Sequence, residues 1–206
     1  MRKLIPGFGV LAASLALAAN VPHLDFSKSF PGSAPAYEAI TVEQTGVGSY
    51  QEAEQDPNPV RFQLTPAEVS DMFSLAAKLG YFDHPIESPA KVAFMGAKTF
   101  RYVNGAASHE VKFNYTEDPT AQALTDWFER IGESERLFTN LEVAAKYDRL
   151  GVDRALLLLG AAYDGNRLVA LRQFLPLLDR IAKSEMYMHQ DRLRAAGLAD
   201  QFRAPK

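Results

Sequence analysis

Apolar and polar residues alternate strictly at four places along the chain. This pattern is typical of strands that have one face in a core and the other in water. The first two such segments are residues 37–43 and 60–64. The other two, residues 99–104 and 110–115, flank Asn104-Gly105, a pair that favours a tight hairpin turn. We therefore expect four antiparallel strands, the last two of which form a hairpin.

Two further segments combine a helix-start signal with apolar residues three and four positions apart. Thr65-Pro66-Ala67-Glu68 supplies a capping hydroxyl, a proline at the first helical position and a glutamate three residues after the cap, and Gly80 ends this helix. Asp118-Pro119 opens the second helix, in which we expect Trp127 to be buried against the sheet. The resulting order, ββαββα, predicts an α+β fold: a four-stranded antiparallel sheet with helices on one face and water on the other.

From Glu133 to Lys206 the pattern is helical throughout and contains no strand. Breaks are expected at Gly151, at residues 164–166 and at Gly197, and Pro176 is expected to kink residues 168–181. No linker rich in proline, glycine or serine precedes this region. We therefore predict an α+β binding module over residues 37–132, followed by an all-helical extension, residues 133–206, packed on it.

The first 18 residues have the pattern of a signal peptide. Arg2 and Lys3 precede an apolar run, residues 4–18, that ends in Ala16-Leu17-Ala18. The run is shorter than the roughly twenty residues that a membrane-spanning helix needs. We expect cleavage after Ala18 and a periplasmic or secreted protein without a stable membrane anchor; a retained anchor is the alternative. Residues 19–36 contain three prolines and no sustained period, so they predict a flexible leader.

Composition and charge narrow the range of partners. The 206-residue chain is 47% hydrophobic and has no cysteine, so packing without disulfides must stabilise it. Proteins that bind the phosphate backbone of nucleic acids carry an excess of basic residues. This chain has a net charge of -3, so we expect no nucleic-acid partner. Residues 19–132 carry eight basic and fifteen acidic side chains, whereas residues 133–206 carry twelve and ten. The two parts either pack against each other or leave an acidic surface for a basic partner.

Two short motifs resemble catalytic or metal-binding patterns but are incomplete. His109-Glu110 begins the zinc motif His-Glu-x-x-His, yet Phe113 stands where the second histidine is needed. Ser88-Pro89-Ala90-Lys91 matches the Ser-x-x-Lys of penicillin-binding enzymes, but the partner motifs of those enzymes are missing. Neither motif therefore indicates a site.

Two groups of titratable residues are equally weak signals. Asp83 and His84 are adjacent, so we expect their side chains to diverge rather than to form a relay. Glu52, Glu54 and Asp56 alternate as in a calcium loop, without its turn glycine or its terminal glutamate. We therefore assign no catalytic, cofactor-binding or metal-binding residue and expect no cofactor.

The segment from Ile40 to Ile131 carries a series of core and turn patterns in a recognisable layout. They are Ile40-Thr41-Val42-Glu43, Leu64-Thr65-Pro66-Ala67-Glu68, Leu79-Gly80-Tyr81-Phe82-Asp83, Lys98-Thr99-Phe100-Arg101-Tyr102, His109-Glu110-Val111-Lys112-Phe113 and Trp127-Phe128. This layout resembles that of the emfourin-like proteins, small bacterial inhibitors of the thermolysin-like metalloprotease protealysin. The resemblance implies a sheet-and-helix fold with a protein-binding role. It covers about half of the mature chain, does not extend past Gly132, and transfers no inhibitory residue.

These features together favour an exported, non-enzymatic module that binds another protein, in the manner of a protease inhibitor. The loops from Gly46 to Pro59 and from Tyr81 to Ala93 are the expected contact regions. Two alternatives stay open. A periplasmic enzyme with a dispersed site would have a deep pocket with convergent titratable groups. A structural or assembly protein that docks through its helical half would leave an apolar helix face exposed.

Overall fold

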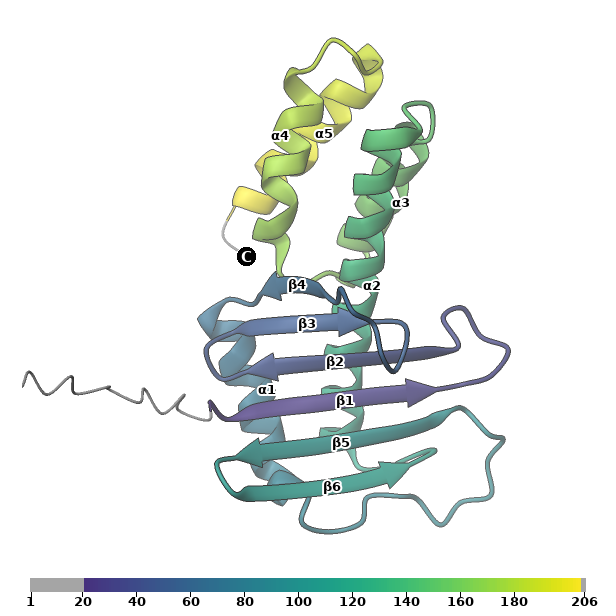
Figure 1. Cartoon of the computed structure of the whole chain (residues 1–206), viewed down its shortest axis with the longest axis vertical. Coiled ribbons are helices and arrows are strands. Elements are labelled where there is room, and N and C mark those ends of the chain that lie inside the picture. Colours follow the sequence, from purple (N-terminus) through teal and green to yellow (C-terminus); the bar gives the residue numbers. More distant parts are fainter. Residues whose placement is uncertain (1–20, 205–206) are drawn as a thin grey trace, which may run out of the picture.

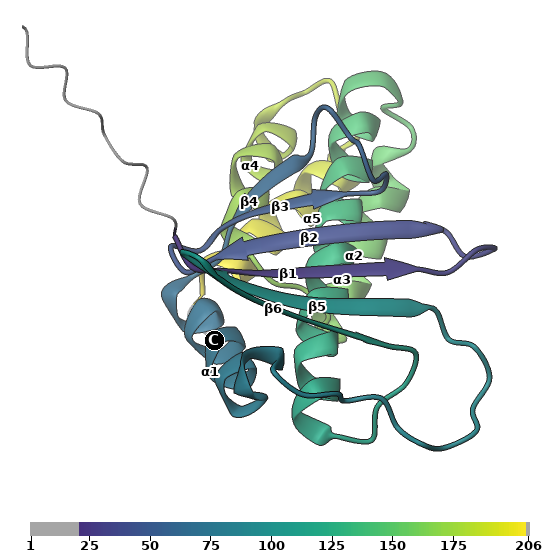
Figure 2. The same ribbon diagram turned by 60° about the horizontal axis from the view of Figure 1, so that its bottom comes forward.

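The computed structural model describes residues 21–204 and has an α+β fold, in which helices cover one face of an antiparallel sheet (Figures 1 and 2). The predicted signal peptide, residues 1–18, lies outside the described residues. The sheet has six strands in the order β4-β3-β2-β1-β5-β6. The strands are β1 (His23–Ser29), β2 (Tyr37–Glu43), β3 (Val47–Gln51), β4 (Val60–Gln63), β5 (Ala97–Asn104) and β6 (Ala107–Phe113).

The first of the two strands that the sequence pattern missed is β1, which lies within residues 19–36. The prediction of a flexible leader is wrong for this segment, because β1 pairs with β2 on one side and with β5 on the other. Phe26 lies opposite Ile40 and Phe100, and all three side chains are buried. The supposed leader is therefore a central strand, and the prediction of a four-stranded sheet is corrected to six strands.

The second missed strand is β3. The glycines at positions 46 and 48 led to the prediction of a turn in this segment. Gly48 lies opposite Phe62 of β4. A Cβ atom at Gly48 would come within 2.2 Å of the Phe62 ring, so the glycine makes room for that ring. Next on this face, Tyr50 is buried in the core. The glycine that breaks the alternation is thus a packing requirement of the sheet.

Helices α1 (Pro66–Lys78) and α2 (Pro119–Tyr147) cross the same face of the sheet (Figure 2). The predicted start of α1 is confirmed: the Thr65 hydroxyl accepts a hydrogen bond from the Glu68 N–H at 3.3 Å, and the Glu68 carboxylate accepts one from the Thr65 N–H at 2.7 Å. The Asp118 side chain caps α2. The helices and the sheet enclose one hydrophobic core, in which the Phe26 and Phe128 rings stack with centroids 4.9 Å apart.

The expectation that Trp127 is buried is only partly met. Trp127 packs against the edge of the core and is partly exposed, and the Arg130 guanidinium lies 4.7 Å from the centroid of its ring. Its neighbour Phe128 is fully buried. The two side chains point about 100° apart around the helix, so only one of them faces the sheet directly.

Beyond the β4 edge the chain forms a group of helices (Figure 1). These elements are α3 (Val152–Asp164), α4 (Leu175–Lys183), α5 (His189–Arg203) and the short 3-10 turn η2 (Leu171–Phe174); a second such turn, η1 (Gly80–Phe82), follows α1. The expected breaks at Gly151 and Gly165 flank α3. The expected break at Gly197 is wrong, because α5 continues through it. Pro176 does not kink a helix but lies in the first turn of α4, where its missing N–H is tolerated.

Helix α2 runs without interruption across residue 132, the predicted boundary between the two regions. Phe128 and Ile131 belong to the core of the sheet, whereas Leu141 belongs to a second core among the helices. One helix therefore takes part in both cores.

A second connection between the two regions is the segment of residues 168–170. Val169 and Ala170 are buried in the core of the sheet. The Val169 N–H donates to the Ser134 hydroxyl at 3.0 Å, and the Ala170 N–H donates to the Glu68 carboxylate at 3.1 Å. Arg130 donates to the Leu168 carbonyl at 3.0 Å. Side chains of α1 and α2 thus bind the backbone of this segment and join the helical region to the sheet.

Candidate functional site

Three loops meet at the end of the sheet where β1 stops (Figure 1). They are residues 30–36 between β1 and β2, residues 52–59 between β3 and β4, and residues 83–96 before β5. Antiparallel pairing in the observed strand order brings all three to the same end. We call them together the loop surface.

The loop surface contains only part of the two loops that the sequence indicated. Residues 47–51 form strand β3, and the Tyr81 ring stacks on the Tyr102 ring at the edge of the core, with centroids 4.3 Å apart. The segments that reach the surface are residues 52–59 and 83–93. The first predicted loop is therefore shorter, and the second begins beyond Tyr81.

The hairpin of residues 30–36 was missed because it was assigned to the leader. It joins the other two loops: the Phe30 ring meets the Phe94 ring edge-on at 5.8 Å, and Pro35 lines a cleft together with Glu52 and Asp56. Its sequence signal was the turn-forming Pro31-Gly32-Ser33 between two alternating segments.

Hydrogen bonds join the loop of residues 83–96 to the residues that follow β6. The Asn114 side chain accepts from the Met95 N–H at 2.6 Å and donates to the Ala93 carbonyl at 3.2 Å. The Asn114 N–H donates to the Glu87 carboxylate at 2.5 Å, and the Ser88 N–H donates to the Tyr115 carbonyl at 2.8 Å. Asn114 and Tyr115, which follow β6, thus bind this loop at several points along its length.

This hydrogen-bonded loop exposes large apolar side chains. The exposed fractions are 40% for Val92, 57% for Phe94 and 49% for Met95. Three such residues within four positions form a small apolar patch, a feature that often marks an interaction site.

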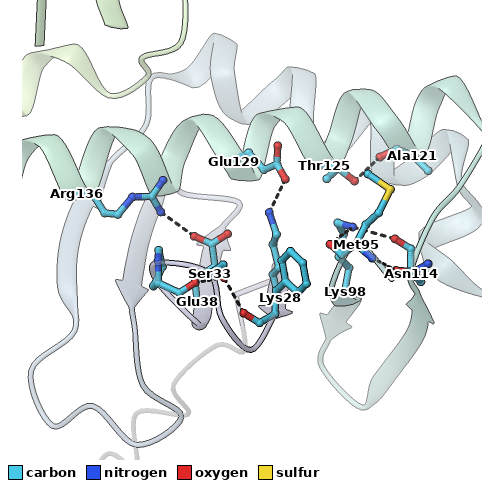
Figure 3. A network of polar contacts seen from close by, with 12 residues as sticks. Lys28, Ser33, Glu38, Met95, Lys98, Asn114, Ala121, Thr125, Glu129 and Arg136 are labelled. Atoms are coloured by element: carbon cyan, nitrogen blue, oxygen red, sulfur yellow. Dashed lines mark hydrogen bonds and ion pairs between the residues drawn. The ribbon is translucent and has the colours of Figure 1, made fainter. Parts of the chain in front are cut away.

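A row of charged contacts lies beneath the loop surface, between the sheet and α2 (Figure 3). Arg136 pairs with Glu38 at 3.0 Å, and Lys28 pairs with Glu129 at 2.9 Å. Lys28 lies opposite Glu38 on one neighbouring strand and opposite Lys98 on the other. The contacts therefore run across neighbouring strands and bind α2 to this end of the sheet.

Burial shapes the ionisation of this row. It raises the pKa of Glu38, although Arg136 opposes the rise. Burial, together with the nearby Lys28, lowers the pKa of Lys98, whose ammonium donates to the Asn114 carbonyl at 2.9 Å. These groups are bonded to one another and to the backbone, and Lys28, Lys98 and Glu129 also line a cavity of about 210 Å³.

A cleft of about 470 Å³ opens between Pro35, strand β3 and helix α2. Its polar lining is largely internally bonded: the Tyr50 hydroxyl donates to Glu52 at 2.7 Å and accepts from Arg136 at 3.4 Å. Burial, and then the hydrogen bond to Glu52, raises the pKa of Tyr50. The cleft is bordered by the carboxylates of Glu52 and Asp56, and none of the three residues of the apolar patch lines it.

The motif residues occupy ordinary structural positions, with one correction. The Ser88 hydroxyl accepts from the Ala90 N–H at 3.1 Å, a turn contact, and His109 is exposed on β6. Asp83 and His84 do not diverge: their side chains are 2.7 Å apart, and this hydrogen bond lowers the pKa of Asp83. Within residues 21–204, no three histidine, aspartate or glutamate side chains gather in a way that could hold a metal ion.

The chain matches no model of a known protein family, and no curated protein matches it in sequence. The candidate site therefore rests on the geometry of the loop surface.

Proposed function

We propose that this protein is an exported, non-enzymatic module that binds another protein through its loop surface. The observation that carries the proposal is the hydrogen-bonded loop of residues 83–96, which holds Val92, Phe94 and Met95 in solvent. A loop that is already ordered loses little conformational freedom on binding. Apolar side chains in solvent gain free energy when a partner covers them.

Two features of the sequence support a protease as the partner and an exported location. The resemblance of residues 40–131 to emfourin-like proteins makes a protease the first partner class to test. The signal-peptide pattern of residues 1–18 supports export to the periplasm or the medium. In residues 21–204, none of the helices combines the length and the apolar character that crossing a membrane requires.

The binding proposal is tested by capture from cell envelope and culture medium with residues 19–206 as bait. Phe94→Ser combined with Met95→Ser removes most of the apolar patch, and we expect a partner captured by the wild type to bind this variant at least about tenfold more weakly. Leu150→Ser, at an exposed position on the helical region, is the matched control and should retain the partner. Equal binding by the loop variant would contradict the proposal.

A separate experiment tests whether the partner is a protease. Purified wild-type protein is titrated into a thermolysin-like metalloprotease, and inhibition should weaken with Phe94→Ser and Met95→Ser. Absence of inhibition at micromolar concentration would remove proteases of this class as partners but leave the binding role intact.

A specific observation favours a second candidate, docking through the helical region. The described residues include twelve exposed large apolar side chains, and eight of them lie in this region. The eight are Val143, Tyr147, Leu150, Leu157, Leu158, Met186, Met188 and Leu193. The same capture experiment separates the two candidates, because docking through the helices would make Leu150→Ser, and not the loop variant, lose the partner. The alternative of an enzyme with a dispersed site stays a prediction.

A further inference from the structure

A buried carboxyl group lies where α2 passes from the core of the sheet to the core of the helices. Glu135 is 0% exposed, and its Oε1 accepts a hydrogen bond from Gln173 Nε2 of η2 at 2.7 Å. Each of the two side chains has one further polar atom, the second carboxylate oxygen Oε2 of Glu135 and the amide oxygen Oε1 of Gln173. Both of these atoms are buried and neither has a hydrogen-bond partner.

The two unpartnered oxygens are complementary only if Glu135 carries a proton. An ionised carboxylate and an amide oxygen are both acceptors, so neither satisfies the other. A proton on Glu135 Oε2 would make this atom the donor that Gln173 Oε1 lacks, and the pair would then have two parallel hydrogen bonds. Burial raises the pKa of Glu135 to about 7, although the hydrogen bond from Gln173 opposes the rise.

Among residues 21–204, no charged group is paired with Glu135, and most of those on the surrounding elements are bonded to other partners. Arg172 of η2 has an exposed side chain. The engaged groups are Glu133 with Arg167, Arg136 with Glu38, Glu68 with the Ala170 N–H, Arg130 with the Leu168 carbonyl, and Arg203 with Asp179.

We propose that Glu135 is protonated in the folded protein and that the Glu135–Gln173 pair is a pH-sensitive catch, which holds η2 and the adjoining residues 168–170 against α2. Loss of the proton places a charge in the interior and removes the donor that would satisfy Gln173 Oε1. The segment of residues 168–170, which connects the helical region to the sheet, then loosens.

The pH dependence of stability follows from the raised pKa of Glu135 in the folded protein. The folded protein keeps the Glu135 proton to a higher pH than the unfolded chain, in which the pKa is near the ordinary value of 4.5. Between that value and about 7 the folded state binds more protons, so the contribution of Glu135 to stability is full below this interval. It decreases as the pH rises through the interval and is lost above it.

The test compares the wild type with Glu135→Gln. A glutamine at position 135 carries an N–H where the acid carries its proton, so it keeps both hydrogen bonds at every pH. We expect a higher melting temperature for the variant than for the wild type at pH 8, and a difference that shrinks toward pH 5. Glu142→Gln removes an exposed carboxylate of the same helix and should not change the pH profile. A variant that melts below the wild type at pH 8 would show that the ionised form is the native one and would overturn the proposal.

Two spectroscopic measurements on the folded protein do not depend on melting. The infrared difference between wild type and Glu135→Gln at pH 6 should contain the C=O band of a protonated carboxylic acid, and its absence would refute the protonated state. Hydrogen exchange at the Val169 and Ala170 amides, corrected for the intrinsic pH dependence, should accelerate above neutral pH in the wild type only. Equal acceleration in Glu135→Gln would show that the catch does not control this segment.

Discussion

Phe128 is the side chain through which α2 meets the sheet. It is fully buried, stacks on Phe26, and lies 5.9 Å from Phe100 between ring centroids. Phe128→Ala should lower the free energy of unfolding by about 3–5 kcal/mol, because it leaves a cavity among aromatic rings. Trp127→Ala should cost less, since this ring is partly exposed. Urea unfolding followed by circular dichroism measures both, and an equal loss in the two variants would place Trp127 in the core as well.

At the residue scale, the sequence pattern shows where an apolar stripe lies on a helix. It does not show which side chains of the stripe are the most deeply buried. Trp127 and Phe128 are adjacent and both belong to the stripe of α2, and nothing in the spacing decides which of them is central. The contact between Asp83 and His84 depends on the turn that follows Gly80, and adjacency in sequence does not encode that turn. The capping box at Thr65 and Glu68 was predictable because both partners lie within one turn of helix.

At the element scale, β1 decides whether the sheet forms. It supplies a partner to both β2 and β5, and Leu24 and Phe26 bring two buried side chains. We expect a variant that starts at residue 37 to be unfolded by circular dichroism and amide NMR, because its sheet would be divided into two unpaired halves. A variant that starts at residue 21 is the control and should fold. A folded, dispersed spectrum from the shorter variant would restore the interpretation of this segment as a leader.

Strands β2, β4, β5 and β6 were predictable because each shows clear alternation between turn signals. Strand β1 was not, because Pro22 and Pro31 flank a short alternation and together give the composition of a loop. Strand β3 was not, because Gly48 occupies an inward position where the pattern requires an apolar side chain. The reason for this glycine is the Phe62 ring of the neighbouring strand, and that contact exists only after the two strands pair.

At the scale of the whole molecule, the two cores should unfold together. Helix α2 contributes Phe128 to one core and Leu141 to the other, and residues 168–170 tie the regions a second time. Trp127 is the only tryptophan and reports on the sheet, whereas far-ultraviolet circular dichroism is dominated by the helices. Denaturation curves from the two signals should coincide at pH 5. Two separate midpoints at that pH would show that the helical region is an independent unit.

The loop surface was only partly predictable because it is a product of strand order. Residues 30–36, 52–59 and 83–96 are distant in sequence, and they meet because β1 lies between β2 and β5. Without β1 the predicted sheet has no place for the hairpin of residues 30–36. The binding of Asn114 to the loop of residues 83–96 depends on the same arrangement, and its sequence neighbours give no sign of it.

The position of His23 at the start of β1 determines how the molecule can be held. This residue lies at the end of the sheet opposite the loop surface (Figure 1), and the seven residues of β1 span about 23 Å between the two ends. A resin attached directly at residue 21 would therefore hold the molecule at the end of the sheet opposite the loop surface and leave that surface facing away from the resin.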